Sequence, residues 1–190
     1  MKRLLDGAVT RGRRPGLGRI VLPDVIVISR AEPADAERFL TLVDALADYE
    51  KLDRPDAAAR QRLVSDAWGA SPRFEAILAQ LNGEAVGYAI IFETYSSFLA
   101  LPTLYLEDLF VTPDARSKGI GTRMLQYLAA EAVRRGCGRM EWIVLDWNEL
   151  ARGVYRRIGA REMTEWVFCR LTGTELTRLA AESADTRSDV

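Results

Sequence analysis

The 190-residue sequence contains no histidine and only two cysteines. Without histidine there is no Ser-His-Asp or Cys-His catalytic system, no histidine general base and no histidine-containing zinc site. The cysteines, Cys137 and Cys169, lie 32 residues apart and form no Cys-x-x-Cys pair, so we expect reduced core thiols rather than redox or metal partners. Any catalysis must therefore use carboxylates, tyrosine, lysine or main-chain amides.

Long apolar runs and a charge excess of either sign are also absent. No apolar run reaches the roughly 18 residues that a membrane-spanning helix requires. Lys and Arg number 26 and Asp and Glu 27, so the net charge of −1 gives no indication of a nucleic-acid or membrane partner. The hydrophobic content of 48% is ordinary for a globular protein, and the length suits one domain. We expect a cytoplasmic protein that binds neither nucleic acid nor membrane.

Residues 1–23 differ from the rest of the chain. They carry one acid, Asp6, and the six basic residues Lys2, Arg3, Arg11, Arg13, Arg14 and Arg19. The segment lacks the continuous apolar core and the cleavage site of a secretory signal. It is predicted to be a disordered extension, with a nucleic-acid-binding arm as the alternative. The folded domain is expected over residues 24–181, followed by a disordered tail over 182–190.

The pattern over residues 24–181 mixes strands and helices with short links and no internal repeat, which predicts an α/β or mixed α+β fold. A hairpin is expected over 73–95, because apolar runs flank the turn Asn82-Gly83. Asn148 is expected to cap a helix, and Gly159 to close it. Further strands are predicted at 25–29, 103–111, 139–146 and 163–171, and helices at 32–50, 56–68, 119–135, 149–158 and 175–181.

Two adjacent acids, Glu107 and Asp108, interrupt the apolar strand predicted at 103–111. Burying an unpaired carboxylate is costly or raises its pKa. Neighbouring strand residues point to opposite faces, so both acids share a site only if a bulge twists the strand. The alternatives are that Glu107 is a solvated carboxylate at the edge and that Asp108 accepts hydrogen bonds from nearby main-chain amides.

The segment RSKGIG, residues 116–121, lies between this strand and the next helix. Glycines at such a turn let main-chain N–H groups approach a ligand, and a helix N-terminus favours an anion. The segment is not a Walker A loop, because no Gly-Lys-Ser/Thr follows at the required spacing, and it lacks the third glycine of a dinucleotide fingerprint. Taken alone, Gly-x-Gly is equally compatible with a plain tight turn.

Arg116-x-x-Gly119-x-Gly121 directly after an acidic strand resembles the acetyl-CoA signature of the GNAT N-acetyltransferase superfamily, R/Q-x-x-G-x-G/A. Six segments in order resemble its spermidine/spermine (diamine) and thialysine N-acetyltransferase branch: LADYE (46–50), FETYSSF (92–98), LYLEDLFV (104–111), RSKGIGT (116–122), VLDWNE (144–149) and VYRRIGA (154–160). The resemblance runs from Val25 to Ala180. It implies the GNAT fold, a central, mostly antiparallel twisted sheet that splays at the cofactor site and is flanked by helices.

The resemblance further implies direct transfer of an acetyl group from acetyl-CoA to a primary amine. Main-chain groups after Asp108 would hold the acetyl-pantetheine arm, with an N–H near Leu109 as the oxyanion donor. The glycine loop would hold the diphosphate at the helix N-terminus. The implied cofactor-binding residues are Leu109, Phe110, Val111, Arg116, Ser117, Lys118, Gly119, Ile120, Gly121, Thr122, Asn148, Glu149, Ala151 and Tyr155.

Tyr155 matches the tyrosine that protonates the departing thiolate in this family, and Glu107 matches the acid that contacts the amine. A tyrosine of pKa about 10 can protonate a thiolate whose acid has a pKa near 8.5, at a cost of about 2 kcal/mol. Without the resemblance, Tyr155 would be interpreted first as an aromatic that packs its short helix on the sheet. The implied substrate-binding residues are Tyr49, Glu50, Glu107, Asp108, Glu141, Trp142, Ile143 and Glu165.

The sequence departs from this branch in two places. The branch's EEGW is shortened here to TEW (164–166), which leaves Glu165 to take the role of the substrate-contacting glutamate. Lys51, Arg54 and Arg60 follow Glu50 where polyamine enzymes carry acids, and such cations would repel a tri- or tetracation. We therefore expect a monoamine, a diamine or a lysine-like amino acid as acceptor.

Two other functions remain open at this point. The same cofactor would serve a protein or peptide amine, which an open groove across the sheet would admit. A CoA-binding regulatory module without turnover is the alternative from another class. Because relatives in this branch form homodimers, the resemblance also implies a homodimer, with its interface near the acceptor site.

Overall fold

The computed structural model describes residues 24–185, so the expectations for residues 1–23 and 186–190 lie outside the described residues. The chain forms two compact units, which divide after Ile143. Each unit is described by itself. Within residues 24–185, no helix is both long enough and apolar enough to cross a bilayer.

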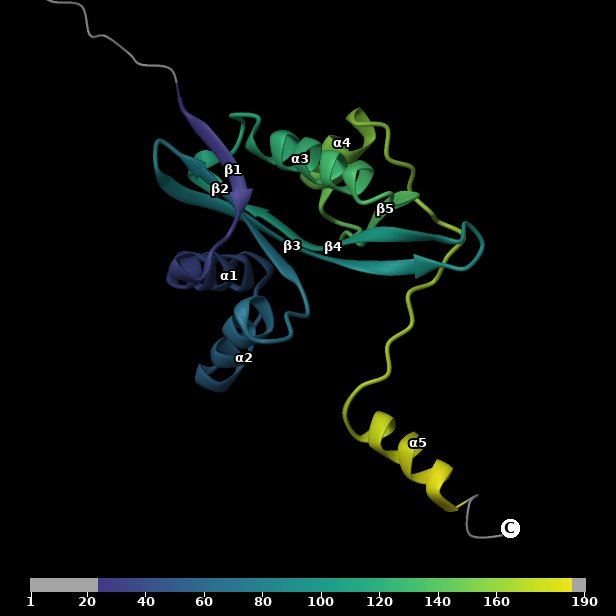
Figure 1. Ribbon diagram of the computed structural model, residues 1–190. Helices are drawn as coiled ribbons and strands as arrows, with labels where there is room; N and C mark the ends of the chain where they lie inside the picture. The colour runs from purple at the N-terminus through teal and green to yellow at the C-terminus, as the bar shows by residue number, and fades with distance from the viewer. Residues whose placement is uncertain (1–23, 186–190) are drawn as a thin grey trace, which may run out of the picture. The chain divides into compact units, whose positions relative to one another are not determined.

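The first unit is built on one five-stranded sheet in the order β1-β2-β3-β4-β5 (Figure 1). The pairings β1–β2, β2–β3 and β3–β4 are antiparallel, and only β4–β5 is parallel. The mixed fold with a mostly antiparallel sheet is therefore confirmed. The strands are β1 (Ile26–Arg30), β2 (Glu75–Leu81), β3 (Glu84–Ser96), β4 (Leu101–Val111) and β5 (Arg139–Trp142).

Helices cover both faces of this sheet: α1 (Ala36–Glu50) and α2 (Ala57–Trp68) lie on one face, and α3 (Ile120–Arg134) lies on the other (Figure 1). Local chemistry sets where each helix begins. Pro33 opens a 3-10 turn, η1 (Pro33–Asp35), directly before α1, and Asp56 caps α2 by accepting a hydrogen bond from the N–H of Ala59 at 2.7 Å. A second 3-10 turn, η2 (Pro113–Ala115), joins β4 to the loop before α3.

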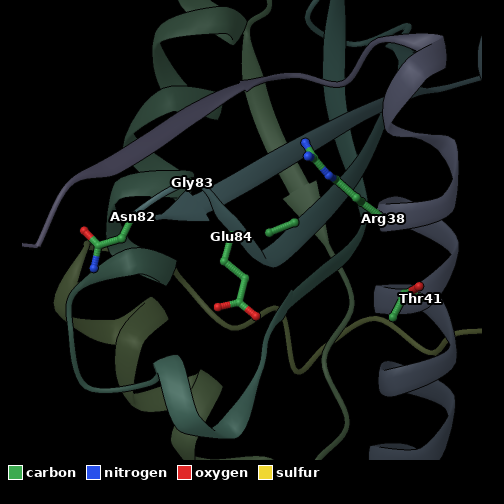
Figure 2. A pocket seen from close by; sticks show the side chains of 6 residues that line it. Arg38, Thr41, Asn82, Gly83 and Glu84 are labelled. Atoms are coloured by element: carbon green, nitrogen blue, oxygen red, sulfur yellow. The ribbon is translucent and has the colours of Figure 1, made fainter.

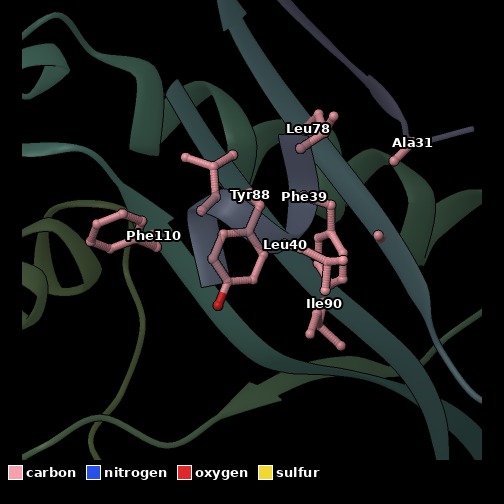
Figure 3. Packing of buried hydrophobic residues seen from close by; sticks show 9 residues of the cluster. Ala31, Phe39, Leu40, Leu78, Tyr88, Ile90 and Phe110 are labelled. Carbon is pink, nitrogen blue, oxygen red and sulfur yellow. The ribbon is translucent and has the colours of Figure 1, made fainter. Parts of the chain in front are cut away.

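The hydrophobic core lies on both sides of the sheet. Tyr88 and Ile90 of β3 belong to a buried cluster with residues of α1, including Phe39 and Leu40 (Figure 3). Alternate residues of β3, such as Ile91, point to the opposite face, toward α3. That second layer of fully buried side chains includes Ile91, Leu104, Leu106, Ile120, Met124 and Leu128. The sheet is thus the middle layer of the first unit.

A cluster of ion pairs fastens the end of α3 to the sheet. Arg135 contacts Glu75 of β2 through both terminal nitrogens at 2.7 and 2.9 Å, and it also contacts Glu131 at 3.1 Å. The side chains of Arg135, Glu75 and Glu131 are only 14%, 21% and 20% exposed. Removing the guanidinium would leave two carboxylates with little solvent to screen them.

We therefore predict that Arg135→Gln lowers the free energy of unfolding by about 1–3 kcal/mol, measured by urea denaturation. The matched control is Arg134→Gln. Arg134 is 67% exposed and pairs with Glu131 one helical turn away, so its loss should cost less than about 0.5 kcal/mol. An equal loss of unfolding free energy in the two variants would contradict the conclusion that Arg135 fastens the end of α3 to the sheet.

The second unit, which begins at Val144, contains α4 (Glu149–Arg157) and α5 (Gly173–Asp185). As predicted, Asn148 caps α4: its Oδ1 accepts a hydrogen bond from the N–H of Ala151 at 3.2 Å. Gly159 follows α4 with a φ of 86°, in the left-handed region that glycine favours. The helix expected at 175–181 is longer at both ends.

Two strand predictions need correction. The strand expected at 139–146 ends at Trp142, and residues 163–171 form no strand. High β-propensity produces a strand only where a neighbouring strand supplies the ladder, and the described sheet ends at β5. The expectation of two core thiols is also wrong for one of them: Cys169 is exposed, while Cys137 is half-buried, and neither forms a disulfide.

Candidate active site

A β-bulge in β4 brings the two adjacent acids together. Ile90 of β3 pairs with Asp108, but the next residue, Ile91, pairs with Leu106, so Glu107 is an extra residue in β4. Asp108 consequently faces α1, because it pairs with Ile90 of the α1-facing cluster and accepts a hydrogen bond from Tyr88. The charge of Glu107 acts on Asp108, which places the two carboxylates near each other. The bulge that the sequence required is present.

Asp108 lies in a setting that disfavours its charge. Burial raises the pKa of its carboxyl group to about 6, and the charges of Glu107 and Glu50 add to this increase. A hydrogen bond from the hydroxyl of Tyr88, at 3.1 Å, acts in the opposite direction. Glu50 is the last residue of α1, and its charge acts on Asp108 in the bulge of β4; Glu50, Glu107 and Asp108 are called the acidic face below.

The acidic face continues toward β5. Tyr105 pairs with Glu141 across the parallel β4–β5 ladder, and Leu106 pairs with Trp142. Burial raises the pKa of Tyr105, and Glu107 and Glu141 raise it further. Glu141 also forms an ion pair with Arg139 at 3.0 Å, which neutralises part of its charge. Trp142 is half-buried, whereas Ile143 is 54% exposed at the end of this unit.

Two tyrosines of this face, Tyr88 and Tyr105, are absent from the residues predicted by sequence. Each lies in an apolar strand: the hydroxyl of Tyr88 donates to Asp108, and the charge of Glu107 helps to raise the pKa of Tyr105. The sequence did contain a signal for them, namely a tyrosine at a strand position that should be buried. A buried tyrosine hydroxyl needs a hydrogen-bond partner. The cross-strand register that supplies the partner was not readable from the sequence.

The glycine loop before α3 has the conformation of an anion cradle. Ser117 and Gly119 have φ values of 63° and 77°, both in the left-handed region. Gly119 is the N-cap of α3, and the first helical hydrogen bond runs from the N–H of Arg123 to its carbonyl at 3.0 Å. The N–H groups of Ile120, Gly121 and Thr122 therefore lie at the open end of the helix, where a diphosphate is favoured.

The space around the two glycines of this loop is open enough for a bound ligand. A Cβ placed on Gly121 would meet no atom within 4 Å, and the same is true of Gly119. Gly121 has no positive φ, so neither backbone geometry nor crowding by the described residues requires a glycine there. Close approach of a ligand to the main chain would account for it. The residues present thus suit the diphosphate of CoA.

The edge of β4 next to this cradle is open along its C-terminal half. The ladder to β5 stops at the pair Leu106–Trp142, while β4 continues to Val111. In the sheet that the structure describes, Leu109, Phe110 and Val111 are paired only with β3, through Ala89, Tyr88 and Gly87. Their outward main-chain groups suit an extended ligand arm.

The side chains of Arg116 and Lys118 are already engaged. The guanidinium of Arg116 lies 4.5 Å from the ring centroid of Tyr49, and its Nε–H donates to the carbonyl of Val111 at 3.0 Å. Lys118 forms an ion pair with Asp24, next to β1, at 3.1 Å. Tyr49 also packs near Phe110, with ring centroids 6.2 Å apart. The predicted substrate residue Tyr49 and the predicted cofactor residue Arg116 therefore lie in contact.

Two of the three cations that follow Glu50, Arg54 and Arg60, are paired with acids. Arg54 pairs with Asp48 through two hydrogen bonds of 2.8 and 2.5 Å, and Arg60 pairs with Asp44 at 2.8 Å. Repulsion of a polycation by these residues is therefore weaker than the sequence suggested. The acidic face retains its attraction for a cationic amine.

The remaining predicted residues belong to the second unit. Tyr155 lies on α4, half-buried, and burial raises the pKa of its hydroxyl. Asn148 and Ala151 take part in the N-terminal cap of α4, and Glu149 forms ion pairs with Arg152 and Arg156 at 2.5 and 2.9 Å. Glu165 is exposed and contacts Arg161 at 3.1 Å.

A separate hollow of about 440 Å³ lies between α1 and the β2–β3 turn (Figure 2). It is lined by Arg38, Thr41, Asn82, Gly83, Glu84 and Ala85, none of which is a predicted site residue. It therefore gives no support to the predicted chemistry.

Comparison with known proteins agrees with these features. Residues 39–160 match the model of the Acetyltransferase (GNAT) family. The thialysine N-epsilon-acetyltransferase of Bos taurus is 32% identical over 168 residues, which cover 83% of this chain and 98% of that protein. The L-ornithine N5-acetyltransferase NATA1 of Arabidopsis thaliana is 46% identical over 98 residues, covering 51% of this chain and 43% of that protein.

Solved structures show the same fold. The integron cassette protein VCH_CASS6, from the mobile metagenome of V. cholerae, superposes with a TM-score of 0.70 at 26% identity, covering 82% of this chain and 97% of that one. The aminoglycoside N-acetyltransferase AAC(6')-Iy in complex with CoA gives 0.67 at 18% identity, covering 82% and 100%. The acidic bulge, the glycine cradle and these matches lead to one conclusion: the chain belongs to the acetyltransferase (GNAT) family and is an N-acetyltransferase.

Proposed function

We propose that the protein transfers an acetyl group from acetyl-CoA directly to a primary amine of a small molecule, either a diamine or a lysine- or ornithine-like amino acid. The observation that carries this proposal is the bulge in β4, which places Glu107 and Asp108 on one face with Glu50. An acidic face attracts a cationic amine. The printed activities of the thialysine and ornithine relatives support an amine on a short aliphatic chain.

The first unit supplies the binding groups for both reactants. The N–H groups at the start of α3 would hold the diphosphate, and the open edge of β4 would hold the pantetheine arm. When bound, acetyl-CoA supplies a thioester carbonyl for the amine to attack and a thiolate as leaving group. A main-chain N–H near Leu109 would donate to the carbonyl oxygen as its negative charge develops.

The substrate ammonium group loses two protons in this reaction. Glu107 accepts one through water and passes it to solvent. The hydroxyl proton of Tyr155 goes to the departing sulfur, and the second ammonium proton restores the tyrosine through solvent. Burial raises the pKa of Tyr155, so its hydroxyl stays protonated and is a donor to the departing sulfur, and the proton transfer is more uphill than from an ordinary tyrosine. The proposal includes a cytoplasmic homodimer, as the resemblance to the branch implies.

A panel of acceptors tests the proposed function. Purified protein and acetyl-CoA are combined with diamines, spermidine, spermine, lysine, ornithine, thialysine and lysine-containing peptides, and release of free CoA is measured with a thiol reagent. We expect the diamines and the basic amino acids to be acetylated, with kcat/KM at least about tenfold above that of any peptide. Mass spectrometry of each product identifies the acetylated nitrogen.

Three results would contradict this assignment. Peptides that outperform every small amine would identify a protein acetyltransferase. Binding of acetyl-CoA by calorimetry, without CoA release in the presence of any amine, would leave only a CoA-binding module. An acetylated cysteine on the protein would exclude direct transfer.

A further inference from the structure

Tyr88 combines complete burial with a polar contact at the margin of the core. Its side chain has an exposed fraction of 0%, and its ring packs edge-on against Phe39, with centroids 5.5 Å apart. Its hydroxyl donates to Oδ2 of Asp108 at 3.1 Å. Figure 3 shows the phenol oxygen directed away from the other labelled side chains of the cluster. Since phenylalanine would fill the same core volume, the hydroxyl acts on Asp108 rather than on packing.

The direction of this hydrogen bond is fixed by burial. Desolvation and the charge of Asp108 raise the pKa of Tyr88 far above its ordinary value. The phenol therefore stays protonated and remains a donor at every pH at which the protein is active. A donor of this kind favours the ionised form of the carboxyl group that accepts from it.

The groups that face Asp108 come from three elements. Tyr88 lies on β3, Glu107 on β4 and Glu50 at the end of α1. The guanidinium of Arg116 lies over the ring of Tyr49 and is not among the groups that act on Asp108. Burial and the charges of Glu107 and Glu50 favour the neutral form of Asp108. Among Tyr88, Glu107 and Glu50, only Tyr88 favours the carboxylate.

We propose that Tyr88 is a positioning residue of the acetyl-transfer site, whose hydroxyl holds Asp108 as a carboxylate on the acidic face so that Asp108 binds the substrate ammonium group. This inference rests on the proposed function in one respect, namely that the acceptor is a cationic amine. The hydroxyl fixes one oxygen, Oδ2, and leaves Oδ1 for the ligand. Tyr88 itself does not touch the amine.

The proposal makes amine binding dependent on pH through Asp108. The carboxyl group titrates at about 6, so it is mostly ionised at neutral pH. Without the phenol, its pKa rises further, because the one favourable hydrogen bond from these neighbours is gone. A hydrogen bond to a charged group is worth roughly one pH unit or more of such a shift.

The test is the variant Tyr88→Phe, examined by two measurements. Carboxyl ¹³C NMR of the protein without amine follows the titration of Asp108, assigned by its loss in Asp108→Asn; we expect the midpoint to move up by about one pH unit. The acid limb of kcat/KM for the best amine should move by the same amount. At pH values well below the acid limb, kcat/KM should fall about tenfold, and at pH values well above it kcat/KM should fall by less than about twofold. Affinity for acetyl-CoA should not change.

Tyr127→Phe is the matched control. Tyr127 is a half-buried tyrosine of α3, on the opposite side of the sheet, and its replacement should leave both the NMR midpoint and the acid limb unchanged. An unchanged Asp108 midpoint in Tyr88→Phe would overturn the proposal. So would a loss of kcat/KM that is equal at all pH values, since that result indicates a packing defect.

Asp108→Asn provides a second route should Tyr88→Phe fail to fold. This variant should lose the acid limb, with a KM for the amine that no longer depends on pH in the range about 5–8. Retention of the limb would overturn the proposal. The NMR titration requires no turnover, so failure of the acceptor panel would refute the proposed function while the effect of Tyr88 on Asp108 is still measured.

Discussion

Tyr155→Phe should lower kcat by about 10²–10⁴-fold while leaving the affinity for acetyl-CoA within about twofold. The substitution removes one hydroxyl from a half-buried ring on α4 and keeps the ring itself, so the helix should fold as before. The expected loss follows from the proposed role, because the departing thiolate would then have to take its proton from water. Steady-state kinetics and calorimetry with acetyl-CoA separate the two effects.

Tyr95→Phe is the control for this experiment. Tyr95 lies near the end of β3 and is 68% exposed, so loss of its hydroxyl should leave kcat unchanged. Unchanged turnover in Tyr155→Phe would remove this tyrosine from the mechanism. A combined loss of turnover and of acetyl-CoA binding would instead indicate that the ring only supports the fold of α4.

Gly121→Val should weaken binding of acetyl-CoA by about 100-fold, equivalent to about 2.7 kcal/mol. A Cβ at Gly121 meets open space in the protein, so the new side chain fits the fold but occupies the place where the diphosphate approaches the N–H groups of α3. Loss of one or two charge-assisted hydrogen bonds accounts for an effect of this size. Calorimetry with CoA measures it directly.

Ala129→Val is the matched control for the cradle. Ala129 lies on the exposed side of the same helix, so a β-branched side chain there reports any general effect on α3. Its affinity for CoA should equal that of the unmodified protein. If Gly121→Val binds CoA as tightly as Ala129→Val does, the diphosphate does not lie against the start of α3.

Local signals in the sequence predicted most of the first unit. The pair Asn82-Gly83 indicated a two-residue hairpin, and both residues have the positive φ angles, 54° and 87°, that such a turn requires. Pro33 and Gly119 marked the starts of α1 and α3 because their backbone preferences act within one turn. The strand prediction for residues 163–171 was wrong for the opposite reason, because strand formation depends on a partner strand that the local sequence does not contain.

The candidate site was predictable in its parts but not in its geometry. Glu107, Asp108 and the loop 116–121 stood out because their residue types are unusual at those places. From the sequence, a bulge was only the condition under which both acids could share a site. The extra residue in β4 becomes visible only in the pairing with Ile90 and Ile91. Tyr88 was missed because its core position concealed the hydroxyl that reaches Asp108.

The engagement of Arg116 and Lys118 has a consequence for how the cradle attracts its ligand. Lys118 is matched by Asp24, whereas Arg116 keeps its positive charge and is held over an aromatic ring. At the start of α3 itself, attraction comes from fixed peptide dipoles at very short range. Ions in solution screen distant charges far more than such contacts, so the contribution of these dipoles to ligand binding should depend only weakly on salt concentration.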